Sequence, residues 1–152
     1  MVILFGRTMV RPYKDLDMTR EERKEKVAAM RRQGYNCAQS VAFGFTDITG
    51  LDEETTARAV AGFGGGVGAQ GEVCGVVSAF AFIAGFMGDS SPRGKAAVYR
   101  DVRELTQPFR EKYGRILCRE LKAKGNAVPC DELIMQGVEI LCDRLENEWM
   151  QK

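Results

Sequence analysis

The hydrophobic and polar positions of this chain recur at helical spacing along most of its length. Between residues 94 and 113 the apolar side chains lie three or four positions apart, which is typical of an amphipathic helix with one buried face. Residues 133–145 repeat this spacing. No stretch alternates apolar and polar residues with the period of two that a half-buried strand has. The pattern therefore predicts an all-α fold.

The longest apolar run, residues 73–88, predicts a helix at the centre of the fold. Its side chains are apolar nearly all round the helix, which indicates burial on most sides. The run is shorter than the roughly twenty residues that a membrane-spanning helix needs, so we expect no membrane span. We predict one bundle-like domain, residues 19–152, of about six helices packed around this one. Residues 1–18 lack a sustained pattern and are expected to form an N-terminal arm that docks on the body or on a neighbouring subunit.

Two helix starts carry recognisable capping signals. Thr19 and Glu22 form the sequence pattern of a capping box, which predicts a first helix that ends near Gly34. Asn36 is a favourable N-cap and predicts a second helix over residues 37–44. The remaining helices are expected at residues 52–63, 73–88, 94–113, 115–124 and from 130 onward.

Composition and charge exclude several classes of partner and cofactor. The 152 residues carry a formal net charge of +1, so nothing indicates binding to nucleic acid or to an anionic membrane. The start of the chain lacks the basic and apolar segments of a secretory signal, and we expect a cytoplasmic protein. The sequence has five cysteines and no histidine, which excludes catalytic Ser-His or Cys-His pairs and His-ligated zinc or haem. Without a Cys-x-x-Cys-His motif, haem attachment is not expected.

Glycine recurs through residues 62–75, directly before the central helix. Such a segment loses much backbone entropy on ordering, so its glycines indicate a place where backbone approaches backbone or a ligand closely. A dinucleotide fingerprint would have to follow a strand, and a Walker loop would need Gly-Lys-Ser/Thr. Neither condition holds, and we expect Gly64, Gly65, Gly66 and Gly75 to form part of a site instead.

Three of the five cysteines fall at predicted helix starts. Cys37 follows Asn36, Cys74 follows the glycine-rich segment and Cys130 follows Pro129. Free backbone N–H groups and the helix dipole stabilise an anion at this position, so the pKa of such a thiol is expected to fall below about 8.5. Thiols of this kind act as nucleophiles or metal ligands at neutral pH.

The other two cysteines lie inside predicted helices. Cys118 is flanked by Arg115 and Arg119, which we expect to support a thiolate or a bound anion. Cys142 is in line with Val138 and Leu145 on an apolar face, and it is expected to be a small buried hydrophobic residue.

These stretches together resemble a known family. The sequence Tyr-Asn-Cys-Ala-Gln-Ser-Val at residues 35–41, Gly-Phe-Gly-Gly-Gly at 62–66, Cys-Gly-Val-Val-Ser-Ala at 74–79, Cys-Arg-Glu-Leu at 118–121 and Cys130 is similar to the C_GCAxxG_C_C family of redox-active bacterial and archaeal proteins. The split-Soret cytochromes resemble the chain over the same region. The similarity covers roughly residues 20–142.

The resemblance implies a helical domain whose four family cysteines form one redox or iron-sulfur site. These cysteines are Cys37, Cys74, Cys118 and Cys130. Two positions depart from the family motif: Val76 stands where the family has alanine, and Ala79 where it has glycine. Both larger side chains thicken the central helix where it packs closely. The haem chemistry of the split-Soret proteins is not implied, because histidine and the Cys-x-x-Cys-His motif are missing.

The sequence is compatible with three functions. The first is a cytoplasmic redox protein whose four thiols bind an iron-sulfur cluster or cycle between dithiol and disulfide. The second is a structural zinc protein in which the same four thiolates hold the metal, and the third is a helical interaction module whose cysteines only pack. A disulfide would require two Cα atoms within about 7 Å, and the expected pair is Cys118 with Cys130, the closest in sequence of the four.

No general base, nucleotide site or substrate pocket can be read from the sequence, so no enzymatic activity is assigned. We expect an electron-transfer or thiol partner whose nature the sequence does not identify. The apolar N-terminal arm and the family resemblance favour a homodimer.

Overall fold

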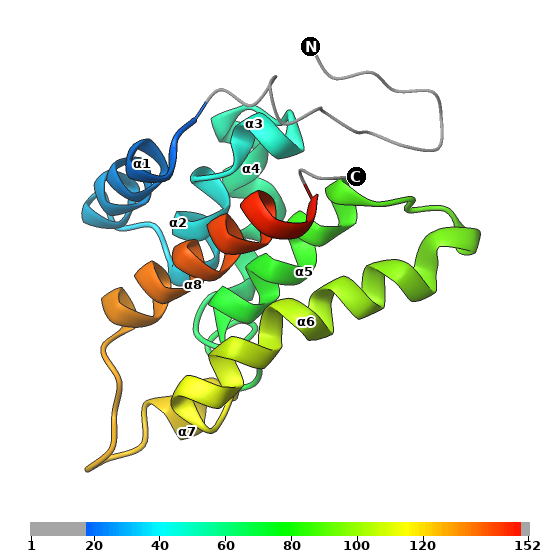
Figure 1. Cartoon of the computed structure of the whole chain (residues 1–152). Coiled ribbons are helices and arrows are strands. Elements are labelled where there is room, and N and C mark those ends of the chain that lie inside the picture. The colour runs from blue at the N-terminus through cyan, green and yellow to red at the C-terminus, as the bar shows by residue number, and fades with distance from the viewer. Residues whose placement is uncertain (1–17, 150–152) are drawn as a thin grey trace.

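The computed structural model describes residues 18–149, which form one all-α domain (Figure 1). This part of the chain has eight α-helices, six of them with seven or more residues, and no strand. The α-helices are α1 (Arg20–Arg32), α2 (Cys37–Phe43), α3 (Thr46–Thr49), α4 (Glu53–Val60), α5 (Gly75–Met87), α6 (Lys95–Tyr113), α7 (Cys118–Leu121) and α8 (Cys130–Arg144), with 3₁₀ turns at Ala61–Phe63 and Pro92–Gly94 and a π-helical turn at Leu145–Trp149. The all-α prediction is confirmed, whereas the predicted N-terminal arm lies, but for its last residue, outside the described residues.

Side-chain caps fix the starts of the first two helices as the sequence predicts. The Thr19 hydroxyl accepts a hydrogen bond from the Glu22 backbone N–H (3.1 Å), and the Glu22 carboxylate accepts one from the Thr19 N–H (3.4 Å). Asn36 and Gln39 make the same reciprocal pair at the start of α2, at 2.9 and 3.1 Å. Each cap satisfies backbone donors that the helix itself leaves free. The cap on α2 thereby fixes the backbone of the adjacent Cys37.

Helix α5 lies at the centre of the domain and packs against α2, α6 and α8 (Figure 1). Val76, Ala79, Phe80 and Ile83 are fully buried, at 0% exposure. Burial of each large side chain of this kind stabilises the fold by roughly 1.5–3 kcal/mol. The predicted central helix is therefore confirmed. Within residues 18–149 no helix is both long and apolar enough to cross a membrane.

A glycine in α8 lets this helix approach α5 closely. A Cβ atom at Gly137 would lie closer than 3.0 Å to Val76 Cγ1, a separation that real Cβ atoms essentially never show. Val76 is the residue that stands where the resembling family has alanine. The larger valine fits because the facing position on α8 has no side chain.

The sequence does not predict α3, and a buried ion pair accounts for its position. Arg23 of α1 donates to both carboxylate oxygens of Asp47 in α3, at 2.7 and 2.9 Å, and to the Gly44 carbonyl at 2.8 Å. The guanidinium also lies over the Phe45 ring, 4.7 Å from its centroid. Both charged side chains are 3% exposed, and loss of either partner would cost roughly 3–5 kcal/mol. These contacts hold α1 and α3 together.

Helix α7 is shorter than the sequence predicts. The helix expected over residues 115–124 is observed only at Cys118–Leu121. The residues before it make long-range backbone contacts instead: the Ile116 carbonyl accepts a hydrogen bond from the Cys74 N–H (2.8 Å), and Leu117 is extended, with φ −83° and ψ 133°. Because these contacts need an extended backbone, the helix begins only at the cysteine.

Candidate functional site

Four cysteines from four different helix starts line one small cavity of ≈ 40 Å³. They are Cys37 of α2, Cys74 directly before α5, Cys118 of α7 and Cys130 of α8. The other lining residues are Gly65, Gly75, Val76, Leu121, Lys122 and Leu133. Cys74 is 4% exposed, whereas the other three cysteines are half-buried and two of the other lining residues, Gly65 and Lys122, lie at the surface. The cavity is therefore reached from solvent beside the glycine-rich segment of residues 62–75, called the glycine-rich loop from here on.

Each of these cysteines stands at the N-terminal end of a helix. Cys37, Cys118 and Cys130 are the first residues of their helices, and Cys74 is the N-cap of α5. The position of Cys118 corrects the prediction, which put it inside a longer helix. The N-terminal ends of α5 and α8 lie toward the same end of the domain as α7 (Figure 1). Convergence of helix starts, rather than closeness in sequence, brings the thiols together.

The glycine-rich loop beside the cavity has a left-handed backbone. Residues 65–69 all have positive φ angles, from +62° to +73°, and two of them, Val67 and Ala69, are not glycine. A hydrogen bond from the Gly71 N–H to the Gly65 carbonyl (3.0 Å) helps to close the loop. A left-handed conformation costs roughly 1–2 kcal/mol for each residue that has a side chain. The rest of the fold therefore holds this loop in a strained form.

Glycine is required where the loop and α5 meet the thiols. A Cβ atom at Gly75 would lie closer than 3.0 Å to Cys37 Sγ, and one at Gly66 would lie 2.8 Å from Cys118 Cβ. A Cβ atom at Gly64 would lie 2.6 Å from the Cγ atom of Asn36, the residue that caps α2. Side chains at these positions would push the loop away from the cavity.

Burial raises the pKa of two of the thiols that line the cavity, Cys74 and Cys118. It raises the pKa of Cys74 to about 12; backbone N–H groups at the start of α5 oppose this rise, and the neighbouring Cys37 and Cys118 add to it. Burial also raises the pKa of Cys118, together with Cys37 and Cys130, whereas Lys122 lowers it. The lowered pKa expected at a helix start is therefore wrong for Cys74, and the pKa of Cys118, for which the sequence predicts support by two arginines, is raised as well. Loss of solvent around these two thiols outweighs the favourable helix ends.

The two arginines expected to support a thiolate are not among the residues that line the cavity. The Arg115 guanidinium donates to three backbone carbonyls at 2.6–3.3 Å, the shortest of these bonds being to Asn126. Arg119 forms an exposed ion pair with Glu72 at 3.2 Å. Both arginines thus brace the backbone on either side of α7.

Lys122 is the charged residue that lines the cavity, and no motif in the sequence singles it out. It lies four residues after Cys118, so the two side chains share one face of the α7 turn. Its Nζ atom donates to the Val128 carbonyl at 2.8 Å. A positive charge here favours the Cys118 thiolate and partly offsets the effect of burial on its pKa. The spacing of four residues from a cysteine is the signal that could have identified it.

The thiols share a cavity without surrounding one metal position. Among residues 18–147 no group of three or more cysteine, aspartate or glutamate side chains is placed to hold one ion. A structural zinc site made of cysteines needs four thiolates in a tetrahedron, and an iron-sulfur cluster of the usual kind also needs four thiolates. As they are placed in this structure, the four thiols therefore do not fit either group. All five cysteines are free thiols.

Cys142 lies apart from the other four and is not among the residues that line the cavity. It is 2% exposed within the apolar face of α8, and burial raises the pKa of its thiol to about 11. These surroundings agree with the packing role that the sequence indicates.

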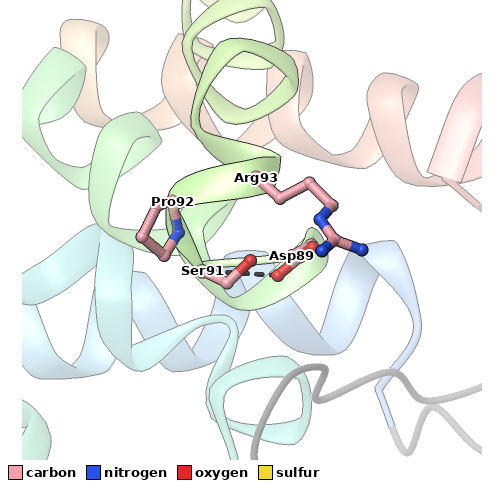
Figure 2. A pocket seen from close by; sticks show the side chains of 4 residues that line it. All are labelled: Asp89, Ser91, Pro92 and Arg93. Carbon is pink, nitrogen blue, oxygen red and sulfur yellow. Dashed lines mark hydrogen bonds between the residues drawn. The ribbon is translucent and has the colours of Figure 1, made fainter.

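A larger hollow lies at the other end of α5 (Figure 2). Asp89, Ser91, Pro92 and Arg93 line it, and its volume is ≈ 720 Å³. The Ser91 N–H donates to the Asp89 carboxylate at 2.9 Å. These residues follow the C-terminus of α5, about 20 Å of helix away from Cys74. Because no cysteine is among these lining residues, we assign the candidate thiol chemistry to the smaller cavity.

The described residues thus form an all-α domain whose helix starts bring four free thiols to one cavity. A family model described as "Putative redox-active protein (C_GCAxxG_C_C)" matches residues 35–144. The match covers more than half of the chain and includes the glycine-rich loop and all five cysteines. The chain therefore belongs to the C_GCAxxG_C_C family, and the resemblance in its sequence is confirmed. No curated protein and no solved structure matched the chain.

Proposed function

We propose that this protein is a redox protein that cycles between a dithiol and a disulfide, with Cys118 and Cys130 as the exchanging pair. The observation that carries the proposal is the cavity shared by four free thiols. Membership in a family described as redox-active supports redox chemistry for this cavity. The partner on this proposal is a cytoplasmic electron-transfer or thiol protein.

The chain between the two proposed cysteines is folded back on itself. The Val128 N–H donates to the Leu121 carbonyl (2.9 Å), and Lys122 Nζ donates to the Val128 carbonyl (2.8 Å). Cys118 lies three residues before this contact and Cys130 two residues after it. This keeps the two helix starts near one another, which supports a disulfide, whose Cα atoms must lie about 4.4–6.8 Å apart. Both cysteines are half-buried, so a partner can reach them.

Exchange with a partner disulfide proceeds in two balanced steps. The Cys118 thiolate attacks one sulfur of the partner disulfide, which forms a mixed disulfide and releases the other partner sulfur as a thiolate. The Cys130 thiolate then attacks the Cys118 sulfur, which forms the intramolecular disulfide and releases the second partner thiolate. The two protons from the cysteines pass to the two partner thiolates. The protein loses two electrons and the partner gains two.

The surroundings of Cys118 control the rate of the first step. Burial raises the pKa of this thiol, with contributions from Cys37 and Cys130, and Lys122 lowers it. Since the thiolate is the attacking species, exchange accelerates as the pH rises toward the Cys118 pKa. The reduced protein is therefore expected to react slowly at neutral pH and faster in mild alkali.

Thiol counting in glutathione buffers of graded potential tests the proposal. We expect the wild type to lose two thiols in one step and to recover them on reduction. This step should disappear in Cys118→Ser and in Cys130→Ser. Cys142→Ser is the matched control, because this buried cysteine lies apart from the cavity, and it should show the same step as the wild type.

Elemental analysis of anaerobically purified protein distinguishes the dithiol proposal from the alternatives in which the four thiols bind a metal or only pack. Stoichiometric iron with sulfide would overturn the dithiol proposal in favour of a cluster, and stoichiometric zinc would do so in favour of a structural site. A metal-free protein whose thiols do not respond to potential would assign the four cysteines to packing.

A further inference from the structure

Two exposed apolar side chains stand beside the cysteine cavity. Phe63 is 39% exposed and Val67 is 38% exposed; within residues 18–147 the other large hydrophobic side chain exposed to this degree is Tyr99 on α6. The Val67 N–H donates to the Phe63 carbonyl (3.3 Å), so both belong to one turn of the glycine-rich loop. Gly65, between them in sequence, lines the cavity. Both apolar residues therefore lie on the stretch of the loop that contributes Gly65 to the cavity.

Val67 is held in this position at an energetic cost. Its φ of +62° lies in the left-handed region, which a β-branched residue rarely adopts. Burial does not offset this cost, because the side chain remains exposed. Glycine at this position would remove the strain and the apolar group together. An exposed apolar side chain kept in strained backbone beside a site is typical of a contact surface.

Basic side chains border the cavity on the side of α7. This helix and its flanking residues carry four basic residues against one acidic residue between residues 115 and 124. Lys122 lines the cavity, and the Arg119 side chain is 55% exposed. Because Arg119 is paired with Glu72, the excess positive charge comes mainly from Lys122 and Lys124.

Backbone hydrogen bonds join the glycine-rich loop to α7. The Arg119 N–H donates to the Gly71 carbonyl (3.1 Å), and the Cys118 N–H donates to the Glu72 carbonyl (2.6 Å). These bonds fasten α7 to the end of the glycine-rich loop. We define the rim of the cavity by its exposed members, which are Phe63, Val67, Arg119 and Lys122.

We propose that the rim docks the redox partner, a protein whose exchanging disulfide lies beside an apolar contact and acidic side chains. This inference rests on the dithiol function proposed above. Charge complementarity selects the partner, because Lys122 attracts a negative surface and repels a basic one. Phe63 and Val67 supply the uncharged contact that excludes water around the reacting sulfurs. A small neutral disulfide uses neither feature and depends only on the thiols.

Oxidation of the reduced full-length protein by three disulfides tests the role of the rim. Two are synthetic peptides of equal length, each closed by one disulfide and carrying the same leucine, with glutamates beside the cysteines in one and lysines in the other. The third is hydroxyethyl disulfide, which is small and neutral. At low ionic strength we expect the acidic peptide to react about ten-fold faster than the basic one. Raising the salt from about 0.01 M to about 1 M should remove this preference, because the Debye length falls from about 30 Å to about 3 Å.

Variants separate the two contributions of the rim. Lys122→Gln should reduce the preference for the acidic peptide to less than about two-fold, whereas Lys95→Gln, the same change at the start of α6, should retain it. Phe63→Ser should slow both peptides several-fold, whereas Tyr99→Ser on α6 should not. The rate with hydroxyethyl disulfide corrects for any change in thiol reactivity.

The outcomes distinguish failure of the rim from failure of the redox function. Equal rates for the two peptides at low salt, with hydroxyethyl disulfide still reacting, would overturn the docking role and leave the dithiol function intact. A faster reaction with the basic peptide would contradict the charge argument. Failure of all three disulfides to oxidise Cys118 and Cys130 would overturn the dithiol function itself.

Discussion

The Sγ atom of Cys37 lies directly against Gly75, in space that a Cβ atom would need. A Cβ atom there would also approach the Ala38 backbone nitrogen (3.1 Å) and the Phe63 carbonyl oxygen (3.2 Å). The first residue of α5 therefore sets how closely α2 and the glycine-rich loop approach the cavity. The shape of the thiol site depends on the absence of one side chain.

Gly75→Ala is expected to destabilise the protein by about 1–3 kcal/mol, because the Cys37 sulfur and two backbone segments would have to move. Gly85→Ala is the matched control on the same helix, since a Cβ atom there would meet nothing within 4 Å. It should be neutral or stabilise the protein by up to about 1 kcal/mol. Urea unfolding measures both variants, and equal effects would contradict the close contact at Gly75.

The contact between Val76 and Gly137 predicts a strong coupling between two substitutions. Gly137→Ala alone should cost about 1–3 kcal/mol of unfolding free energy, because the new methyl group would overlap Val76 Cγ1. Val76→Ala removes that overlap, so the double variant should be more stable than the sum of the single effects by at least about 1 kcal/mol. A double-mutant cycle in urea measures this coupling. Additive costs would show that the two helices do not meet at these residues.

Stability should fall at alkaline pH in a way that depends on Cys74. Its pKa is raised from 9.0 to about 12 in the folded state, so the folded protein keeps a proton that the unfolded chain releases between these values. The stabilisation is complete below the unfolded pKa and is lost as the pH rises toward the folded pKa. Unfolding free energies of the wild type should therefore fall more steeply than those of Cys74→Ala, by on the order of 1 kcal/mol per pH unit. Parallel curves for the two proteins would count against a buried, protonated Cys74.

Local sequence patterns predict most of the fold, because most of its features depend on residues a few positions apart. The capping box at Thr19 and the cap at Asn36 are of this kind, and both are confirmed. Helix α3 depends instead on an ion pair between Arg23 and Asp47 across 24 positions. The start of α7 depends on backbone bonds to the segment before α5. Local patterns carry no signal for such distant contacts.

The members of the candidate site are easier to predict than their chemistry. Helix-start placement and the family resemblance name the four cysteines that line the cavity. The pKa of Cys74 rises rather than falls because it depends on burial, which only the packed structure reveals. The positive φ of Val67 has no local signal either, since valine rarely adopts it. The sequence does carry a usable signal for Lys122, because its spacing of four residues from Cys118 can be read there.

Peptide mapping of the mildly oxidised protein tests the central claim most directly. Trypsin cleaves between Cys118 and Cys130, so the two cysteines fall on separate peptides that stay joined only through a disulfide. The Cys142→Ser variant removes the second cysteine from the later peptide. We predict one linked species, which joins residues 116–119 to residues 125–144 and disappears on reduction. A species that links Cys118 to either of the other cavity cysteines, or no linked species at all, would contradict this account.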